Sequence, residues 1–166
     1  MGGHNFEDYI SGTDVGQAYE KAVADAIEEH GHSSYNGTVS TTDGYLVLDD
    51  TPRPLNEALE IARRKIDDPR IEKGGYCGAI PVLSTRRDIF AAIPAKPGGY
   101  LTRDEAADAA LAPHLREGET VDRYYLQVDA VHHADTGRIV SGSVRAPVEG
   151  GEATHAGWLF FGMAAS

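Results

Sequence analysis

Cysteine and tryptophan occur only once each in this chain of 166 residues, and long apolar runs are missing. The single cysteine, Cys77, cannot form an internal disulfide, which fits a reducing compartment. No apolar run approaches the roughly 20 residues that a membrane helix needs. The N-terminus has no basic region followed by an apolar core, so we expect no secretory signal. The sequence therefore predicts a cytoplasmic protein that does not enter a membrane.

Basic residues are also scarce: 15 Lys and Arg stand against 26 Asp and Glu, a net charge of -11. General nucleic-acid binding relies on clustered Lys and Arg, so we expect none here. The simplest interpretation of the scattered acidic residues is a solvated surface. A second interpretation is an acidic mimic of nucleic acid that occupies a basic groove on a host protein.

Established catalytic motifs are missing as well. The chain contains no Walker A loop, nucleophile elbow, dinucleotide fingerprint, CxxC or HExxH motif. His30 and His32 are spaced like a metal pair, but a metal site needs three or more converging ligands. We therefore predict no metal and no cofactor. Cys77 lies at the start of an apolar strand, where we expect a small buried residue and not a nucleophile.

Three helices are predicted from apolar periodicity and from capping residues. Asp14 is a natural N-cap with Gln17 three residues later, and Gly31 is suited to end this helix. Its apolar stripe includes Val15, Tyr19, Val23 and Ile27. A second helix is predicted from residue 55 to 66, before Pro69. Thr102 and Glu105 form a capping box for a third helix that runs to about Leu111.

Strands are predicted in the segments between the helices. We expect hairpins formed by 38–42 with 45–48 and by 76–83 with 88–93, with Pro81 at an edge or strand end, and a C-terminal β-meander from 124 to 164. Residues 1–12 form a flexible arm or an edge strand. In the last strand, Trp158 and Phe160 should face one side of the sheet and Leu159 and Phe161 the other, which predicts a central strand covered by helices. The prediction is one α+β domain over residues 1–166, with a mostly antiparallel sheet and about three helices packed on one face.

The stretch from Gly31 to Thr42 is the best candidate for a binding site, because it joins the end of a helix to the next element and is rich in polar side chains. An equally weighted alternative is a simple turn, since Asn-Gly favours positive φ. The partial negative charge at a helix C-terminus favours cationic or donor-bearing groups and places phosphate poorly. The candidate ligand-binding residues are His30, His32, Tyr35, Asn36, Thr38 and Ser40.

The same stretch carries a family resemblance. Gly31–Ser40, which follows an Ala/Glu-rich helix and contains Gly-His-x-x-Tyr-x-Gly-Thr, resembles a group of small uncharacterised proteins of bacteriophages, mobile elements and some actinobacteria. The aromatic stretch Gly157–Gly162 is similar too. The resemblance implies a phage-type accessory role and brings no catalytic residues with it.

The predicted function is therefore non-enzymatic: the protein binds a host macromolecule or a small polar ligand. One alternative is a small hydrolase that uses His32 as a base near Tyr35 and Thr38. The acidic mimic that inhibits a host protein is the other.

Overall fold

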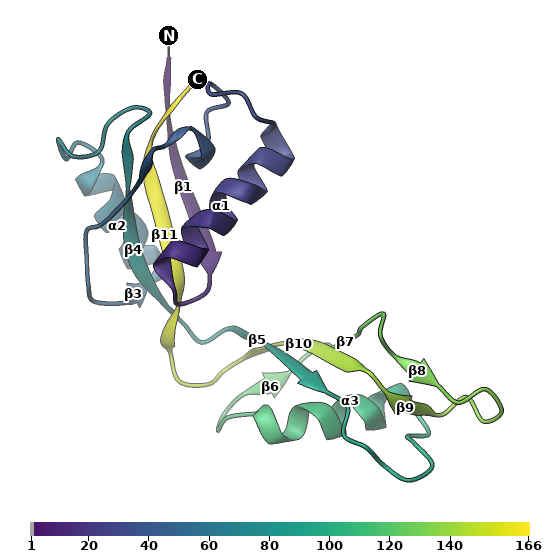
Figure 1. The fold of residues 1–166 in the computed structure, drawn as a ribbon. Coiled ribbons are helices and arrows are strands. Elements are labelled where there is room, and N and C mark those ends of the chain that lie inside the picture. The colour runs from purple at the N-terminus through teal and green to yellow at the C-terminus, as the bar shows by residue number, and fades with distance from the viewer. Residues whose placement is uncertain (1) are drawn as a thin grey trace. The chain divides into compact units, whose positions relative to one another are not determined.

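A computed structural model describes residues 2–166 and confirms the α+β class, with three α-helices and eleven strands (Figure 1). The chain divides into two compact units, which are described separately below. Unit 1 comprises the residues up to Ser84 together with Thr154–Ser166, and unit 2 comprises Thr85–Ala153. That residues 1–166 behave as a single domain stays a prediction.

The sheet of unit 1 is built around the last strand of the chain. Its order is β1 (Gly3–Ser11), β11 (Thr154–Ala165), β4 (Tyr76–Ser84) and β2 (Gly44–Val47), with the short β3 (Arg53–Pro54) also on β4. The pairs β1–β11 and β11–β4 are antiparallel, while β2 and β3 run parallel to β4. The 1–12 segment thus contains an edge strand, and Met1, its first residue, lies outside the described residues.

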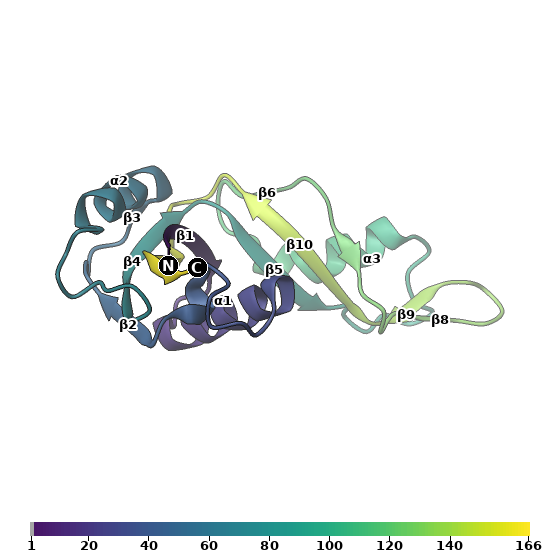
Figure 2. The same cartoon turned by 90° about the horizontal axis from the view of Figure 1, so that it is seen from above.

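Helices cover both faces of this sheet, not one face as predicted (Figure 2). Trp158 and Phe160 pack with α1 (Val15–His30), and Leu159 and Phe161 pack with α2 (Leu55–Lys65). The predicted alternation along β11 and its central position are therefore confirmed. A strand that is apolar on both faces requires a cover on each face, because either exposed face would leave large apolar side chains in water.

The predicted N-cap of α1 is confirmed, since Asp14 Oδ1 accepts a hydrogen bond of 2.8 Å from Gln17 N. Gly31 follows the helix with a φ of 83°, in the region that favours glycine. The deepest row of the helix consists of Ala18, Ala22 and Ala26, while Val23 and Ile27 are only half-buried. The small alanines let the helix lie close to the aromatic side chains of β11.

The predicted hairpin of 38–42 with 45–48 is wrong. Residues Val39–Thr41 form a 3-10 helix, η1, and β2 pairs with β4 instead. Local hydroxyl groups explain the difference. Thr41 and Thr42 donate side-chain hydrogen bonds to the carbonyls of Thr38 and Val39, and such local bonds compete with a β-ladder.

The second predicted hairpin is also wrong, because β4 and β5 (Arg87–Ala92) belong to different sheets. Their burial explains this: β4 is buried at six consecutive positions, whereas β5 alternates between buried and exposed. Pro81 lies inside β4 and not at its end, at the point where pairing with β2 has stopped and pairing with β3 has not begun. The missing N–H of proline is tolerated where a ladder is interrupted.

Unit 2 contains a smaller sheet in the order β5, β10 (Ser143–Glu149), β6 (Thr120–Val121), with β7 (Tyr125–Leu126) also on β10. The helix α3 (Arg103–Leu111) packs on one face, and the Thr102 cap is confirmed by its 3.2 Å hydrogen bond from Glu105 N. A short 3-10 helix, η2 (Ala112–His114), follows α3. The core of unit 2 consists of the inward side chains of β5 and β10 with the alanines and Leu111 of α3.

The predicted meander is more broken than expected. Its first strand is reduced to β7 and to β8 (Val131–His132), which pairs with β9 (Ile139–Ser141). The predicted strand from 138 to 145 is divided at Gly142, whose φ is 138°. A Cβ there would lie 2.8 Å from Ala130 Cα, so the break depends on glycine.

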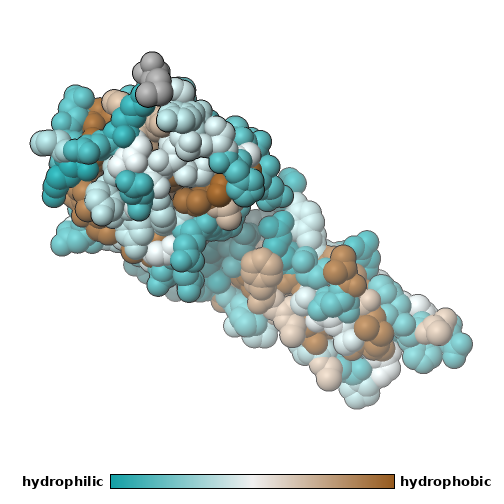
Figure 3. All heavy atoms as spheres, turned by 45° about the horizontal axis from the view of Figure 1, so that its top comes forward, coloured by the Kyte–Doolittle hydropathy of each residue, from teal (hydrophilic) through white to brown (hydrophobic). Residues whose placement is uncertain are grey.

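Hydrophilic and neutral residues dominate the face shown in Figure 3, with hydrophobic residues in small patches. In residues 2–166, no helix has the length and apolar character to cross a membrane.

Candidate functional site

The predicted site stretch begins where α1 ends, and Asn36 organises it. The Asn36 amide nitrogen donates hydrogen bonds to Gly31 O at 3.0 Å and to Ser40 Oγ at 2.8 Å. Its amide oxygen accepts from the backbone N–H and the hydroxyl of Thr38. The Thr38 and Ser40 hydroxyls lie 2.8 Å apart. Asn36, Thr38 and Ser40 thus form a closed hydrogen-bond network that fixes the loop.

Backbone contacts hold this loop against the end of β11. Gly37 N donates to Ala165 O at 2.8 Å, and Ala165 N donates to Thr41 Oγ1 at 3.1 Å. Gly37 has a φ of 75°, so the Asn-Gly turn has the positive φ that the sequence indicates.

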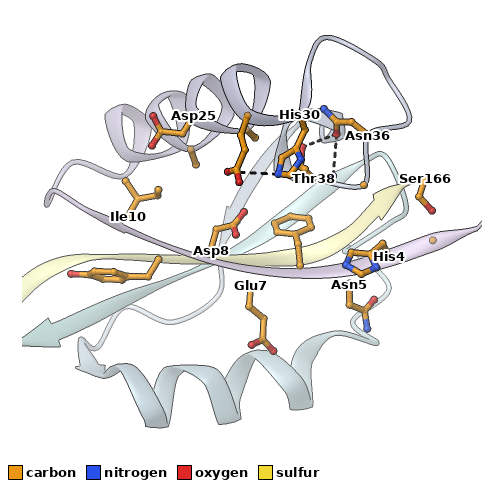
Figure 4. Close-up of a pocket in the computed structure, with 17 residues that line it drawn as sticks. His4, Asn5, Glu7, Asp8, Ile10, Asp25, His30, Asn36, Thr38 and Ser166 are labelled. Atoms are coloured by element: carbon orange, nitrogen blue, oxygen red, sulfur yellow. Dashed lines mark hydrogen bonds and ion pairs between the residues drawn. The ribbon is translucent and has the colours of Figure 1, made fainter.

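A groove of about 800 Å³ lies between α1, β1 and this loop, within unit 1 (Figure 4). Three of the six predicted site residues line it: His30, Asn36 and Thr38. His32 and Tyr35 are not among its lining residues, and both are exposed, Tyr35 by 55%. Ser40 belongs to the loop network behind Thr38.

Strand alternation decides which side chains of β1 enter the groove. Asp8 points toward α1, whereas Glu7 points toward α2 (Figure 4), where it accepts a 3.2 Å hydrogen bond from Arg63 Nε. Phe6 and Ile10 are on the same face of β1 as Asp8 and pack with the alanines of α1. The groove therefore has an apolar base and a carboxylate that comes from the edge strand.

Acidic residues of α1 face the same groove. Asp25 and Glu29 line it at i, i+4 spacing, together with His30 at the end of the helix. Asp25 is paired with Lys21 at 2.5 Å, and Glu29 Oε2 lies 3.7 Å from His30 Nε2. Lys and Arg are absent from the lining residues in the described part of the chain.

Asp8 is the least compensated of these carboxylates. Burial and, secondarily, the charge of Glu29 raise the pKa of Asp8 above 3.8, while the neighbouring His30 acts in the opposite direction. Within residues 2–166, the structure shows no hydrogen bond or ion pair to the Asp8 side chain. A half-buried carboxylate without a partner is electrostatically suited to a cationic group from outside the chain.

Sequence reasoning missed Asp8, Asp25 and Glu29. The i, i+4 spacing of Asp25 and Glu29 beside Ala22 and Ala26 was a usable signal, because these positions share one helix face. Asp8 gave no comparable signal, since its role depends on the pairing of β1 with β11.

Cys77 is fully buried, as predicted, and burial raises the pKa of its thiol to about 12. A thiol with this pKa is protonated at neutral pH and is a poor nucleophile.

Histidine and carboxylate side chains do not gather into a metal centre in the described residues 2–166: no group of three or more His, Cys, Asp or Glu is arranged to hold an ion.

Comparison with protein-family models, with curated proteins and with solved structures finds no match to this chain.

Proposed function

We propose that this chain is a non-enzymatic binding protein and that the groove between α1 and β1 holds a small polar ligand. The observation that carries the proposal is the groove itself, about 800 Å³ in volume, with an apolar base and polar walls. Pockets that bury small ligands span roughly 300–1,000 Å³ and combine apolar contact with a few polar groups.

Side-chain positions favour binding over the hydrolase alternative. His32, the proposed base, is exposed and lies outside the groove lining, as does Tyr35. The Thr38 hydroxyl is already engaged by Asn36 and Ser40. A general base and its target must come within hydrogen-bond reach of one substrate, and His32 does not line the groove that Thr38 lines.

The wider role in this proposal is that of a phage-type accessory protein in the cytoplasm, which acts on a host macromolecule or responds to a small ligand. Support for it comes from the resemblance at Gly31–Ser40 and from the excess of acidic residues. The single buried thiol of Cys77 is compatible with a reducing compartment.

The test is a ligand screen read by ¹⁵N–¹H NMR on the full chain, with native mass spectrometry of the purified protein to find any retained compound. We expect ligands to shift the amide signals of β1 and of the second half of α1, because these segments wall the groove. Amides of unit 2 serve as the internal control. If a chemically diverse library at millimolar concentration shifts no groove signal, or shifts only signals of unit 2, the proposal is wrong.

A further inference from the structure

We infer that the ligand of this groove is an aliphatic cation, an ammonium or guanidinium group on an apolar stem, with the cation at Asp8. The inference rests on the proposed function and specifies its ligand class. It uses the shape of the groove, the state of its carboxylates and its apolar base.

The groove has the form that a linear ligand needs. Its lining includes every residue of β1 from Gly3 to Ile10, and seven residue steps along a strand span about 23 Å at roughly 3.3 Å per residue. Opposite β1, Ala22 and Ala26 line the helix side with side chains of only one carbon. A narrow stem fits between a strand and such a helix face.

An apolar stem has matching contacts near Asp8. Phe6 is buried beside the alanines of α1, and Ile10 packs against the same cluster. Phe6 and Ile10 are each two residues from Asp8 on the same face of β1. A methylene chain placed along this face would bury apolar surface, at about 25 cal/mol per Å².

Among the carboxylates in and beside the groove, Asp8 is the one that is suited to pair with a ligand cation. Asp25 is paired with Lys21, Glu29 lies near His30, and Glu7 is bound by Arg63 on the opposite face of the sheet. Asp8 alone among them has no protein cation within contact distance in the described chain. An ammonium or guanidinium group would complete its coordination and would relieve its repulsion with Glu29.

Anionic ligands are disfavoured by the same residues. The carboxylates on the groove side are those of Asp8, Asp25 and Glu29, and the lining residues include no Lys or Arg among residues 2–166. The C-terminal end of α1 adds partial negative charge near His30. A neutral ligand would leave the Asp8 carboxylate desolvated and unpaired.

The experiment compares three ligands with the same six-carbon stem: hexylamine, 1-hexanol and hexanoate. Each is titrated into the full chain at pH 7 and low salt, with binding followed by NMR shifts of groove amides. We expect hexylamine to bind about tenfold more tightly than hexanol or better, corresponding to about 1.4 kcal/mol, and hexanoate to bind more weakly than either. Added salt should weaken only the binding of the amine appreciably.

Variants test the role of Asp8. Asp8→Asn should weaken hexylamine binding about tenfold and leave hexanol binding unchanged. Glu20→Gln removes the same charge from the exposed side of α1, outside the groove, and should leave hexylamine binding within about twofold. Glu29→Gln provides a second groove variant, and thermal melting shows whether each variant is folded.

The outcomes separate the two proposals. Equal binding of amine and alcohol, or an amine affinity that Asp8→Asn leaves unchanged, overturns the cation inference while groove binding stands. Equal losses in Asp8→Asn and Glu20→Gln would show only a general effect of net charge and also overturn it. If no ligand of any charge shifts the groove amides, both the inference and the proposed function are wrong.

Discussion

The sheets of the two units differ in how many of their faces are covered by helices. In unit 1, β4 and β11 are buried on both faces because α1 and α2 cover the two sides of the sheet. In unit 2, β5 and β10 alternate between buried and exposed, and α3 packs on one face of their sheet. The difference shows that burial pattern along a strand reports how many faces need a cover.

Along β5 and β10, every second side chain points away from the core of unit 2, and these outward side chains form an exposed row. Phe90 and Tyr125 lie on either side of Arg145 in the strand register, and the Arg145 guanidinium lies 4.9 Å from the centre of the Tyr125 ring. Phe90 is 67% exposed. Unit 1 also exposes apolar side chains, such as Tyr35 and Tyr76, but the aromatic residues of its central strand β11 are all buried.

Charge differs between the units as well. Unit 1 has seven Lys and Arg against fifteen Asp and Glu, a net charge of -8, and unit 2 has eight against eleven, a net charge of -3. The excess of acidic residues thus belongs mainly to the unit that contains the groove. This supports a cationic ligand more directly than the charge of the whole chain does.

The largest effect is expected when the same residue type is truncated in each unit. Phe160→Ala removes a fully buried ring that contacts Tyr19 and Tyr45, so the free energy of unfolding should fall by about 3–5 kcal/mol. Phe90→Ala, in the exposed row of unit 2, should change it by no more than about 0.5 kcal/mol. Urea unfolding followed by circular dichroism measures both, and Trp158 fluorescence follows unit 1. Similar losses in the two variants would show that Phe90 is covered in solution.

A partly buried ion pair gives the next largest effect, in unit 2. Arg87 donates two hydrogen bonds of 2.7 Å to Glu119, whose side chain is only 2% exposed. Glu119→Gln should cost about 1.5–3 kcal/mol, because it weakens the charge-assisted hydrogen bonds from Arg87. The control is Glu149→Gln, which breaks the exposed pair with Arg86 and should cost less than about 1 kcal/mol. If the two variants lose the same free energy of unfolding in urea, the low exposure of Glu119 does not strengthen its ion pair.

Asp8 in unit 1 and Glu119 in unit 2 should respond to pH in opposite directions. The hydrogen bonds from Arg87 lower the pKa of Glu119 below 4.5, so its stabilisation is present above that value and is lost as pH falls through the lowered pKa. Burial and then Glu29 raise the pKa of Asp8 above 3.8, so the stability that its protonated form contributes is lost as pH rises through the raised pKa.

The variant Asp8→Asn tests the expected direction in which Asp8 makes stability depend on pH. We expect its melting temperature to exceed that of the parent at pH 7, by a small amount, and the difference to disappear at pH values below about 3.8. Melting curves across this range for parent, Asp8→Asn and Glu119→Gln provide the comparison. A lower melting temperature of Asp8→Asn at pH 7 would mean that the Asp8 carboxylate has a stabilising partner.

The smallest effect on stability is expected in the loop after α1. His32→Ala and Tyr35→Phe change exposed side chains and should alter the free energy of unfolding by no more than about 0.5 kcal/mol. The sequence predicts that both variants weaken whatever binding the protein has, but both residues lie outside the groove lining, so we expect the hexylamine titration to show unchanged affinity. Strong destabilisation with unchanged binding would show that the two residues have a structural role.

The sequence was most informative where the determining contacts are local. Asp14 and Gln17 set the start of α1, Gly31 its end, and Thr102 with Glu105 the start of α3, since each contact spans only three or four residues. The alternation of Trp158, Leu159, Phe160 and Phe161 also indicated a central strand, because adjacent strand residues face opposite sides.

Half of the predicted site residues line the groove, and those positions are near the helix end that the sequence indicated. The other wall could not be predicted. Asp8 meets Glu29 and His30 only because β1 pairs with β11 and α1 crosses the same face of the sheet. No periodicity within β1 specifies which helix its side chains will face.

The sequence by itself determined the helices, the N-caps of α1 and α3 and the two-sided burial of the last strand, because these depend on neighbours within one or two turns or on simple alternation. Only the tertiary structure decided the strand partners. β4 pairs with β11 and not with β5, and the close approach depends on Gly78, where a Cβ would lie 2.3 Å from the Phe161 ring. A strand forms its hydrogen bonds with segments that are distant in the sequence. An apolar pattern indicates that one face of a strand is buried, but it does not specify which element covers that face.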